Sequence, residues 1–168
     1  METPALPETT CNNVLLVDDE EIDLFINEKV ISSTNFSKKI HKAPSGRLGI
    51  EFLKNVKDKS ELPEIIFLDL NMPLMNGFDF LAAFEKLPSD ITSHCRIVIL
   101  SSSNSDQDRS KALKHSTVMK YMCKPINNYL LGELKKISDA KKGQNPINEI
   151  IKNFKIIQNG KTESQDAA

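Results

Sequence analysis

The 168-residue chain lacks several features that would each point to a particular class of protein. Its charges are balanced, with 22 basic and 23 acidic residues and a formal charge of -1, so overall charge gives no reason to expect nucleic acid or an anionic membrane as a partner. No apolar run is long enough to span a bilayer, and the start at Met1 shows no basic segment leading into an apolar one. We therefore expect a cytoplasmic protein with neither nucleic-acid nor membrane partners.

Cysteine is scarce as well. Cys11, Cys95 and Cys123 are widely separated and odd in number, which fits neither a disulfide framework nor a paired-cysteine metal site. We interpret them as ordinary free thiols, which usually behave as small hydrophobic residues. What remains is an ordinary globular composition, 39% apolar and 27% charged, on a chain whose length suits one domain with a tail.

Short apolar runs bounded by polar residues recur along the chain. The three that are compact and continuous cover residues 14–17, 65–68 and 97–100. Such runs predict strands that are buried on both faces of a parallel sheet. A further strand is expected at 118–122, and a weaker one at 39–43, whose mixed polarity suits the edge of a sheet.

Apolar residues at helical spacing fill the segments between these runs. They predict helices over 22–33, 48–56, 78–87, 106–115 and 130–137. The apolar face of the first helix is expected to consist of Ile22, Phe25, Ile26 and Val30. Five strands that alternate with five helices predict an α/β fold, a doubly wound five-stranded parallel sheet with helices on both faces.

The predicted domain covers residues 13–142. Residues 1–12 hold two prolines and little that could pack, so we expect a disordered lead-in there. The C-terminal extension, 143–168, is largely polar, but it contains apolar residues at helical spacing, namely Ile147, Ile150, Ile151, Phe154 and Ile157. An extra helix at this position could pack on the domain, or it could present an apolar stripe to another protein or to a second copy in a weak homodimer.

Polar functional groups follow four of the predicted strands. Asp18 and Asp19 follow the first strand, Asp69 the third, Ser101 the fourth and Lys124 the fifth. A parallel sheet brings these ends to one edge, where open α/β sheets bind their ligands. Three carboxylates in one place repel one another unless a cation neutralises them, and a hard divalent ion such as Mg²⁺ suits oxygen ligands.

This set of groups suits phosphoryl transfer to a carboxylate. Asp69 would act as the nucleophile and form an aspartyl phosphate, the metal ion and the Lys124 ammonium would neutralise charge, and the Ser101 hydroxyl would bind a phosphoryl oxygen. Taken singly, each residue has an ordinary explanation as an acidic helix start, a helix cap or a surface lysine. Their joint placement at four strand ends favours the functional interpretation.

Four stretches resemble the receiver domain of two-component response regulators. Leu15–Asp19 is similar to the acidic pair of that family, Leu68–Gly77 to its phosphoacceptor loop, Leu100–Ser102 to its switch hydroxyl, and Lys124–Pro125 to its lysine and proline. The resemblance covers about residues 12–140. It implies a flavodoxin-like fold with strand order 2-1-3-4-5.

The resemblance also implies a chemistry for the acidic site. Asp69 would accept a phosphoryl group from a phosphohistidine on a sensor histidine kinase or a histidine phosphotransfer protein. Mg²⁺ would be held by Asp19, Asp69 and the backbone carbonyl of Asn71, and by Asp18 largely through water. The protein would then be no enzyme in the usual sense, with only weak self-catalysed phosphorylation and dephosphorylation.

A conformational switch is the second implication. Phosphorylation would draw Ser101 inward and let Tyr121 turn from an exposed to a buried position, although Tyr121 could also be a plain core residue. The changed surface, formed by 106–115, 118–122 and 130–137, would be read by a downstream protein whose identity the sequence does not reveal.

Some features depart from the family pattern. The switch hydroxyl is a serine where threonine is commoner, segment 87–95 is longer than usual, and the residues after the last helix are too few for an effector domain, which predicts a stand-alone regulator. Two alternative functions stay open. One is a phosphate-independent scaffold with this fold, and the other is a haloacid-dehalogenase-type phosphatase, whose pattern requires a second acid where this chain has Asn71.

Overall fold

The three continuous apolar runs form the centre of the sheet in the computed structural model, which describes residues 9–143. The strands of this part of the chain are β1 (Cys11–Val17), β2 (Ser37–Ala43), β3 (Ile65–Asp69), β4 (Arg96–Ser101) and β5 (Val118–Cys123). All neighbouring strands are parallel, and their order is β2-β1-β3-β4-β5, which confirms the predicted topology. The mixed-polarity strand β2 lies at an edge, as expected.

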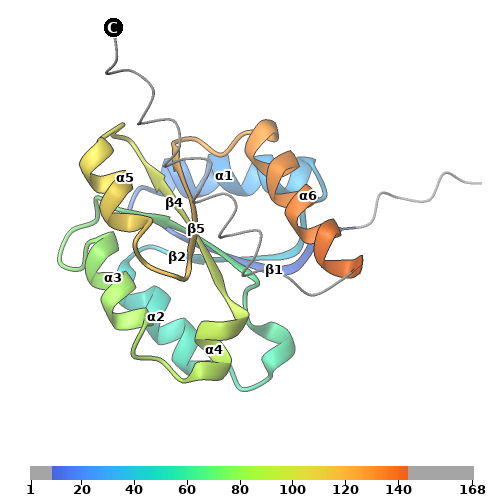
Figure 1. Ribbon diagram of the computed structural model, residues 1–168, viewed down its shortest axis with the longest axis horizontal. Coiled ribbons are helices and arrows are strands. Elements are labelled where there is room, and N and C mark those ends of the chain that lie inside the picture. The colour runs from blue at the N-terminus through green and yellow to red at the C-terminus, as the bar shows by residue number, and fades with distance from the viewer. Residues whose placement is uncertain (1–8, 144–168) are drawn as a thin grey trace, which may run out of the picture.

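Helices cover both faces of this sheet (Figure 1). Within the described residues they are α1 (Glu21–Ser33), α2 (Gly46–Asn55), α3 (Gly77–Phe84), α4 (Ser89–His94), α5 (Asp106–Ala112) and α6 (Asn128–Gly143), with a 3₁₀ turn η1 (Lys59–Glu61). The predicted helices correspond to α1, α2, α3, α5 and α6. Across residues 9–143, no helix has the length and apolar character needed to cross a membrane.

Helix α4 was not predicted. It occupies the segment 87–95 that had looked long for a simple connection, and it begins directly after Pro88. Its six residues bury a single apolar side chain, Ile91. A helix this short shows too little of the 3.6-residue period to be recognised from spacing.

Two hydrophobic layers separate the sheet from its helices. Alternate strand residues such as Leu15, Ile66 and Ile99 pack on the layer beneath α2, α3, α4 and α5. The residues between them, such as Leu16 and Phe67, pack on the opposite layer beneath α1 and α6. Because both faces are covered, the central strands are apolar throughout, and their polar groups stand only at their ends.

The prediction of which residues of α1 face the core is wrong. Three of the four predicted residues are exposed, with 71%, 58% and 39% of their surface accessible in Ile22, Phe25 and Ile26. The side chains that α1 buries are Leu24, Asn27 and Ile31. Apolar residues occur all around this helix, so two different lines of side chains satisfy helical spacing and the spacing does not choose between them.

The predicted lead-in over 1–12 extends too far. Thr10 and Cys11 are buried, and their backbone amides donate to the carbonyl of Phe36 at 3.1 and 3.0 Å. The strand start was hidden by Asn13, a buried polar residue whose Nδ2 donates to the Ser60 carbonyl. Residues 1–8 and the helix expected at 147–157 lie outside the described part of the chain.

Candidate functional site

Asp69 is the last residue of β3, and the backbone behind it is closely packed. All five residues of β3 are buried. The Gly77 amide donates to the Leu70 carbonyl at 2.9 Å and closes the loop after Asp69. A Cβ atom on Gly77 would lie 2.6 Å from Leu70 Cδ2 and 2.8 Å from the Asp69 carbonyl oxygen, so only glycine fits here. A capping box between Asn76 and Asp79 then starts α3.

The three predicted acids gather at the carboxyl ends of β1 and β3. One carboxylate oxygen from each of Asp18, Asp19 and Asp69 lies within 4.8 Å of the other two. Asp18 and Asp69 are each only 3% exposed, while Asp19 is half-buried. Asp18 also accepts the Glu20 amide at 3.0 Å, which fixes the turn into α1. The structure therefore brings these acids together as the sequence predicted.

The acidic group has unused acceptors. Among the described residues, Asp19 Oδ1 and Asp69 Oδ1 have no hydrogen-bond partner. Burial raises the pKa of the Asp69 carboxyl above its ordinary value, and the charge of Asp18 adds to this, while Lys124 and the Asn71 amide oppose it. Buried carboxylate oxygens without donors are suitable ligands for a hard cation, so this donor set fits Mg²⁺. Whether the Asn71 carbonyl takes part stays a prediction.

Lys124 lies at the centre of the acids. Its Nζ is 2.7 Å from Asp18 Oδ2, 2.8 Å from Asp23 Oδ2 and 3.5 Å from Asp69 Oδ1. Burial alone would lower the pKa of Lys124, but the hydrogen bonds that its ammonium donates to Asp18 and Asp23, together with the charge of Asp69, outweigh burial and raise it. The side chain is therefore held as a cation among these carboxylates.

Asp23 is the site residue that the sequence analysis missed. The inward face predicted for α1 was the wrong one, so Asp23 was not included in the predicted site. Asn27, one helical turn further on, is only 2% exposed, and its Oδ1 accepts the Ile126 amide at 3.1 Å. Two polar residues at i and i+4 were the available signal, and they bind the loop that carries Lys124.

Ser101 stands at the end of β4, beside the acids. The strand register pairs Asp69 with Leu100, so Ser101 lies one residue further along the same edge. The Ser101 side chain is fully buried, and its Oγ accepts the Ser103 amide at 3.1 Å. The predicted hydroxyl thus belongs to this edge of the sheet and is tied to the loop that leads to α5.

Tyr121 takes an inward position on β5. It is 2% exposed, and its hydroxyl donates to the Ser103 carbonyl at 3.1 Å. The exposed position expected before phosphorylation is therefore not the one in this structure. The rotation of Tyr121 on phosphorylation stays a prediction, and Ser103 is the residue that connects it to Ser101.

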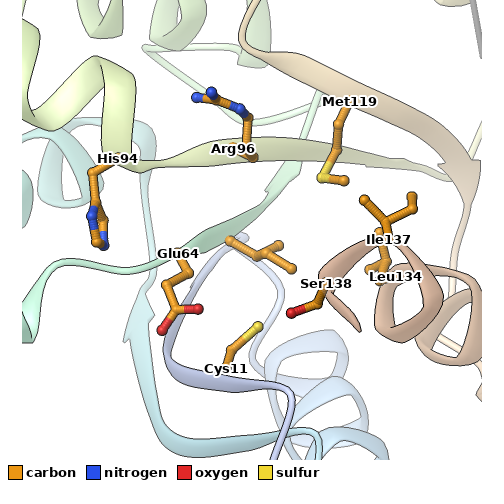
Figure 2. Close-up of a pocket in the computed structure, with 9 residues that line it drawn as sticks. Cys11, Glu64, His94, Arg96, Met119, Leu134, Ile137 and Ser138 are labelled. Carbon is orange, nitrogen blue, oxygen red and sulfur yellow. The ribbon is translucent and has the colours of Figure 1, made fainter. Parts of the chain in front are cut away.

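A second concave region lies at the opposite edge of the sheet, where the strands begin. This cavity of about 90 Å³ is bordered by Cys11, Arg96, Leu134 and Ser138, among other residues (Figure 2). In that view the Arg96 guanidinium points away from Cys11 and Ser138. It donates to the carbonyls of Ser93 and Cys95 at 3.1 and 3.0 Å, which holds the turn between α4 and β4. We interpret this cavity as a packing space and the acidic edge as the candidate site.

Comparisons with known proteins agree with this geometry. The family description "Response regulator receiver domain" matches residues 14–135, a range that contains every site residue described above. The chain is similar to "Hybrid signal transduction histidine kinase I" of Dictyostelium discoideum, with 27% identity over 72% of this chain and 7% of the kinase. It is also similar to "Nitrate/nitrite response regulator protein NarL" of Escherichia coli (strain K12), with 36% identity over 60% of this chain and 43% of that protein. The chain thus spans less than half the length of these two relatives.

A solved structure matches over nearly its whole length. The two component response regulator from Cytophaga hutchinsonii is 29% identical, and the match covers 78% of this chain and 98% of that one with a TM-score of 0.73. The similarity therefore extends over most of the fold that the structure describes.

Proposed function

Because the chain belongs to the response regulator receiver family, we propose that it is a signalling protein that accepts a phosphoryl group from a phosphohistidine on Asp69. The observation that carries the proposal is the setting of this carboxylate. Asp69 is buried at the end of β3, its Oδ1 lacks a donor within residues 9–143, and the Lys124 ammonium lies 3.5 Å away. An available oxygen beside a cation is what a nucleophile for phosphoryl transfer needs.

The proposed reaction is a direct transfer between two side chains. A carboxylate oxygen of Asp69 attacks phosphorus, the P–N bond to the donor histidine breaks, and its electron pair stays on the imidazole nitrogen. Lys124 neutralises charge on the transferring group, and the Ser101 hydroxyl donates to a phosphoryl oxygen. In this proposal the protein is a phosphorylation-controlled module of the cytoplasm, and catalysis is limited to its own phosphorylation and dephosphorylation.

A metal ion completes the proposed site. Asp19, Asp69 and the Asn71 carbonyl would hold Mg²⁺, with Asp18 contributing through water. When bound, the ion would neutralise the acids and stabilise charge on the phosphoryl oxygens. Support comes from the three clustered carboxylates and from their oxygens that lack donors in the described structure.

The proposed output passes from Ser101 to α5. Ser101 and Tyr121 both bind Ser103, and Arg109 of α5 lies over the Tyr121 ring, with its guanidinium carbon 4.9 Å from the ring centroid. In the described part of α5, Ala112 is the one buried residue, so this helix is weakly anchored and can shift at low energetic cost. A new hydrogen bond from Ser101 to a phosphoryl group would therefore change the surface of α5, β5 and α6 that a downstream protein reads.

The donor protein has an apolar surface available on α1. Ile22, Phe25 and Ile26 are exposed on this helix, which begins two residues after Asp19. A sensor kinase or phosphotransfer protein must dock beside the acids to reach the buried Asp69, and this surface suits such contact. Phe25→Ser should then slow transfer from a phosphohistidine protein about fivefold, while the rate with acetyl phosphate stays unchanged. Equal slowing with both donors would contradict a docking role.

Acetyl phosphate with Mg²⁺ provides the direct test of the proposed function. Intact-protein mass spectrometry should detect the addition of one phosphoryl group to the wild-type protein and to Asp58→Asn, a surface control, but none to Asp69→Asn. A persistent mass gain in Asp69→Asn would refute the assignment. Steady turnover of a small phosphate ester would instead favour the phosphatase alternative, and partner binding that ignores Asp69→Asn would favour the scaffold.

A further inference from the structure

Helix α1 binds the loop after β5 at two points. Asp23 accepts a hydrogen bond from the Lys124 ammonium at 2.8 Å, and Asn27, one turn later, accepts the Ile126 amide at 3.1 Å. These contacts join residues that are 101 and 99 positions apart in the chain. The position of Lys124 therefore depends on α1 as well as on the acids at the sheet edge.

The distances around Lys124 are unequal. Its Nζ lies within 2.8 Å of Asp18 and Asp23 but 3.5 Å from Asp69 Oδ1, which has no hydrogen-bond partner in the described part of the chain. Asp18 and Asp69 are almost fully buried, while the Asp23 side chain is 31% exposed. Asp23 is thus the partner that lies outermost and can be given up with the least loss of solvation energy.

We propose that Asp23 is a positioning residue that competes with the phosphoryl group for Lys124. The inference rests on the proposed function and deepens it. Before phosphorylation, Asp23 holds the ammonium back from Asp69 and leaves the attacking oxygen without a donor. After phosphorylation, the more negative phosphoryl oxygens attract the ammonium, and the pair between Lys124 and Asp23 opens.

This exchange has a consequence for α1. Asp23 lies in the first turn of the helix, next to the exposed Ile22, whereas Asn27 stays bound to the Ile126 backbone. Loss of the Lys124 contact would loosen the first turn while the second turn stays in place. The surface that α1 presents beside the acids would then differ between the two phosphorylation states.

Beryllofluoride, a phosphoryl analogue that adds to carboxylates, provides the test. The full-length wild type, Asp23→Asn and Glu21→Gln would be titrated with beryllofluoride and Mg²⁺, and affinity would be measured by calorimetry. Asp23→Asn should bind about fivefold more tightly, because Lys124 has no competing partner to leave. Glu21→Gln removes a negative charge from the same exposed turn and should match the wild type within about twofold.

Two further measurements separate competition from general electrostatics. In a Lys124→Met background, Asp23→Asn should no longer change the affinity, and Asp23→Glu in the wild-type background should restore it toward the wild-type value. Carbon-13 NMR of the wild type should show a shift of the Asp23 carboxyl signal when the analogue binds. These readouts would not respond to a purely structural role of Asp23.

The outcomes are distinct. Equal affinities for the wild type and Asp23→Asn, equal tightening in Glu21→Gln, or an effect that persists without Lys124 would each overturn the role of Asp23. If Asp23→Asn proves poorly folded, the affinity of Asp23→Glu and the carbon-13 signal of the Asp23 carboxyl group in the wild type test the role of Asp23 instead. A wild type that fails to bind the analogue would count against the proposed function itself and would overturn both.

Discussion

At the amino ends of the strands Arg96 is surrounded by carbonyl oxygens, whereas at the carboxyl ends Asp18, Asp19 and Asp69 surround one another. The Arg96 Nη1 atom donates to the carbonyls of both Ser93 and Cys95, although Nε has no partner in the described residues. At the carboxyl ends of the strands, three carboxylates lie close together and repel one another. The amino edge therefore uses a half-buried charge to hold the fold, while the carboxyl edge keeps an unfavourable arrangement that the proposed chemistry requires.

The backbone shows the same contrast. Each edge has a non-glycine residue in the left-handed region, Asn35 with φ 55° before β2 and Leu74 with φ 65° after β3. Asparagine tolerates this conformation, whereas leucine adopts it at a cost. Leu74 is also fully exposed, so no packing offsets the strain. The loop beside Asp69 therefore carries more backbone strain than the loop before β2.

The largest expected effect is that of Mg²⁺, which should relieve the repulsion at the carboxyl edge. At about one hundred times its dissociation constant, the ion should raise the free energy of unfolding of the wild type by about 2.7 kcal/mol. Asp19→Asn, which removes one of the clustered carboxylates, should lose most of this gain, and Glu21→Gln should keep it. Thermal denaturation with and without chelator measures both. An equal response in Asp19→Asn would mean that the ion binds elsewhere.

The next effect concerns the amino edge. Arg96→Ala should lower the free energy of unfolding by about 2 kcal/mol, because it leaves the Ser93 and Cys95 carbonyls without their donor. Arg47→Ala is the matched control, since the Arg47 side chain is 81% exposed and forms a surface ion pair with Glu51. Urea denaturation should show little change for that variant. Equal effects of the two substitutions would remove the contrast between the edges.

Asp69→Asn should act in the opposite direction and stabilise the protein by about 1 kcal/mol at pH 7 without Mg²⁺. Burial raises the pKa of Asp69, so the folded chain binds the proton more tightly than the unfolded chain does. Stability therefore falls as pH rises from the unfolded pKa of about 3.9 through the raised folded value. The advantage of the variant should be complete above that window and shrink toward zero at pH 4.

The control for this pH dependence is Glu51→Gln, which removes a surface carboxylate from α2. Urea denaturation at pH 7 and at pH 4 should give a difference from the wild type that changes with pH for Asp69→Asn and stays small for the control. A variant that is less stable than the wild type at pH 7 would show that the ionised Asp69 stabilises the fold.

The strand order and the acidic edge were predictable because their signals are local. Continuous apolar runs such as Ile65–Leu68 identify buried strands, and polar residues directly after them must stand at the strand ends. The parallel sheet then brings the ends together without further information. Asp18, Asp19 and Asp69 could therefore be placed at one site from the sequence alone.

The orientation of α1 was not predictable in this way. Apolar residues occur all around this helix, and on its inward side Asp23 and Asn27 bind a loop about a hundred residues later. The start of β1 was hidden for a similar reason, since Asn13 is paired with the Ser60 carbonyl, 47 positions away. The burial of a polar residue whose partner is distant in sequence cannot be predicted from the local spacing of apolar residues.

The smallest expected effect exchanges the two left-handed residues. Leu74→Asn should raise the free energy of unfolding by about 0.5 kcal/mol, because asparagine tolerates φ 65° and no buried contact of the exposed leucine is lost. Asn35→Leu should lower it by about 1 kcal/mol, because that change introduces the strain at the amino edge. Urea denaturation measures both, and Leu48→Asn, an exposed leucine inside α2, controls for the loss of apolar surface. Destabilisation by Leu74→Asn would show that Leu74 stabilises the fold. It would contradict the interpretation that Leu74 adds strain to the loop beside Asp69.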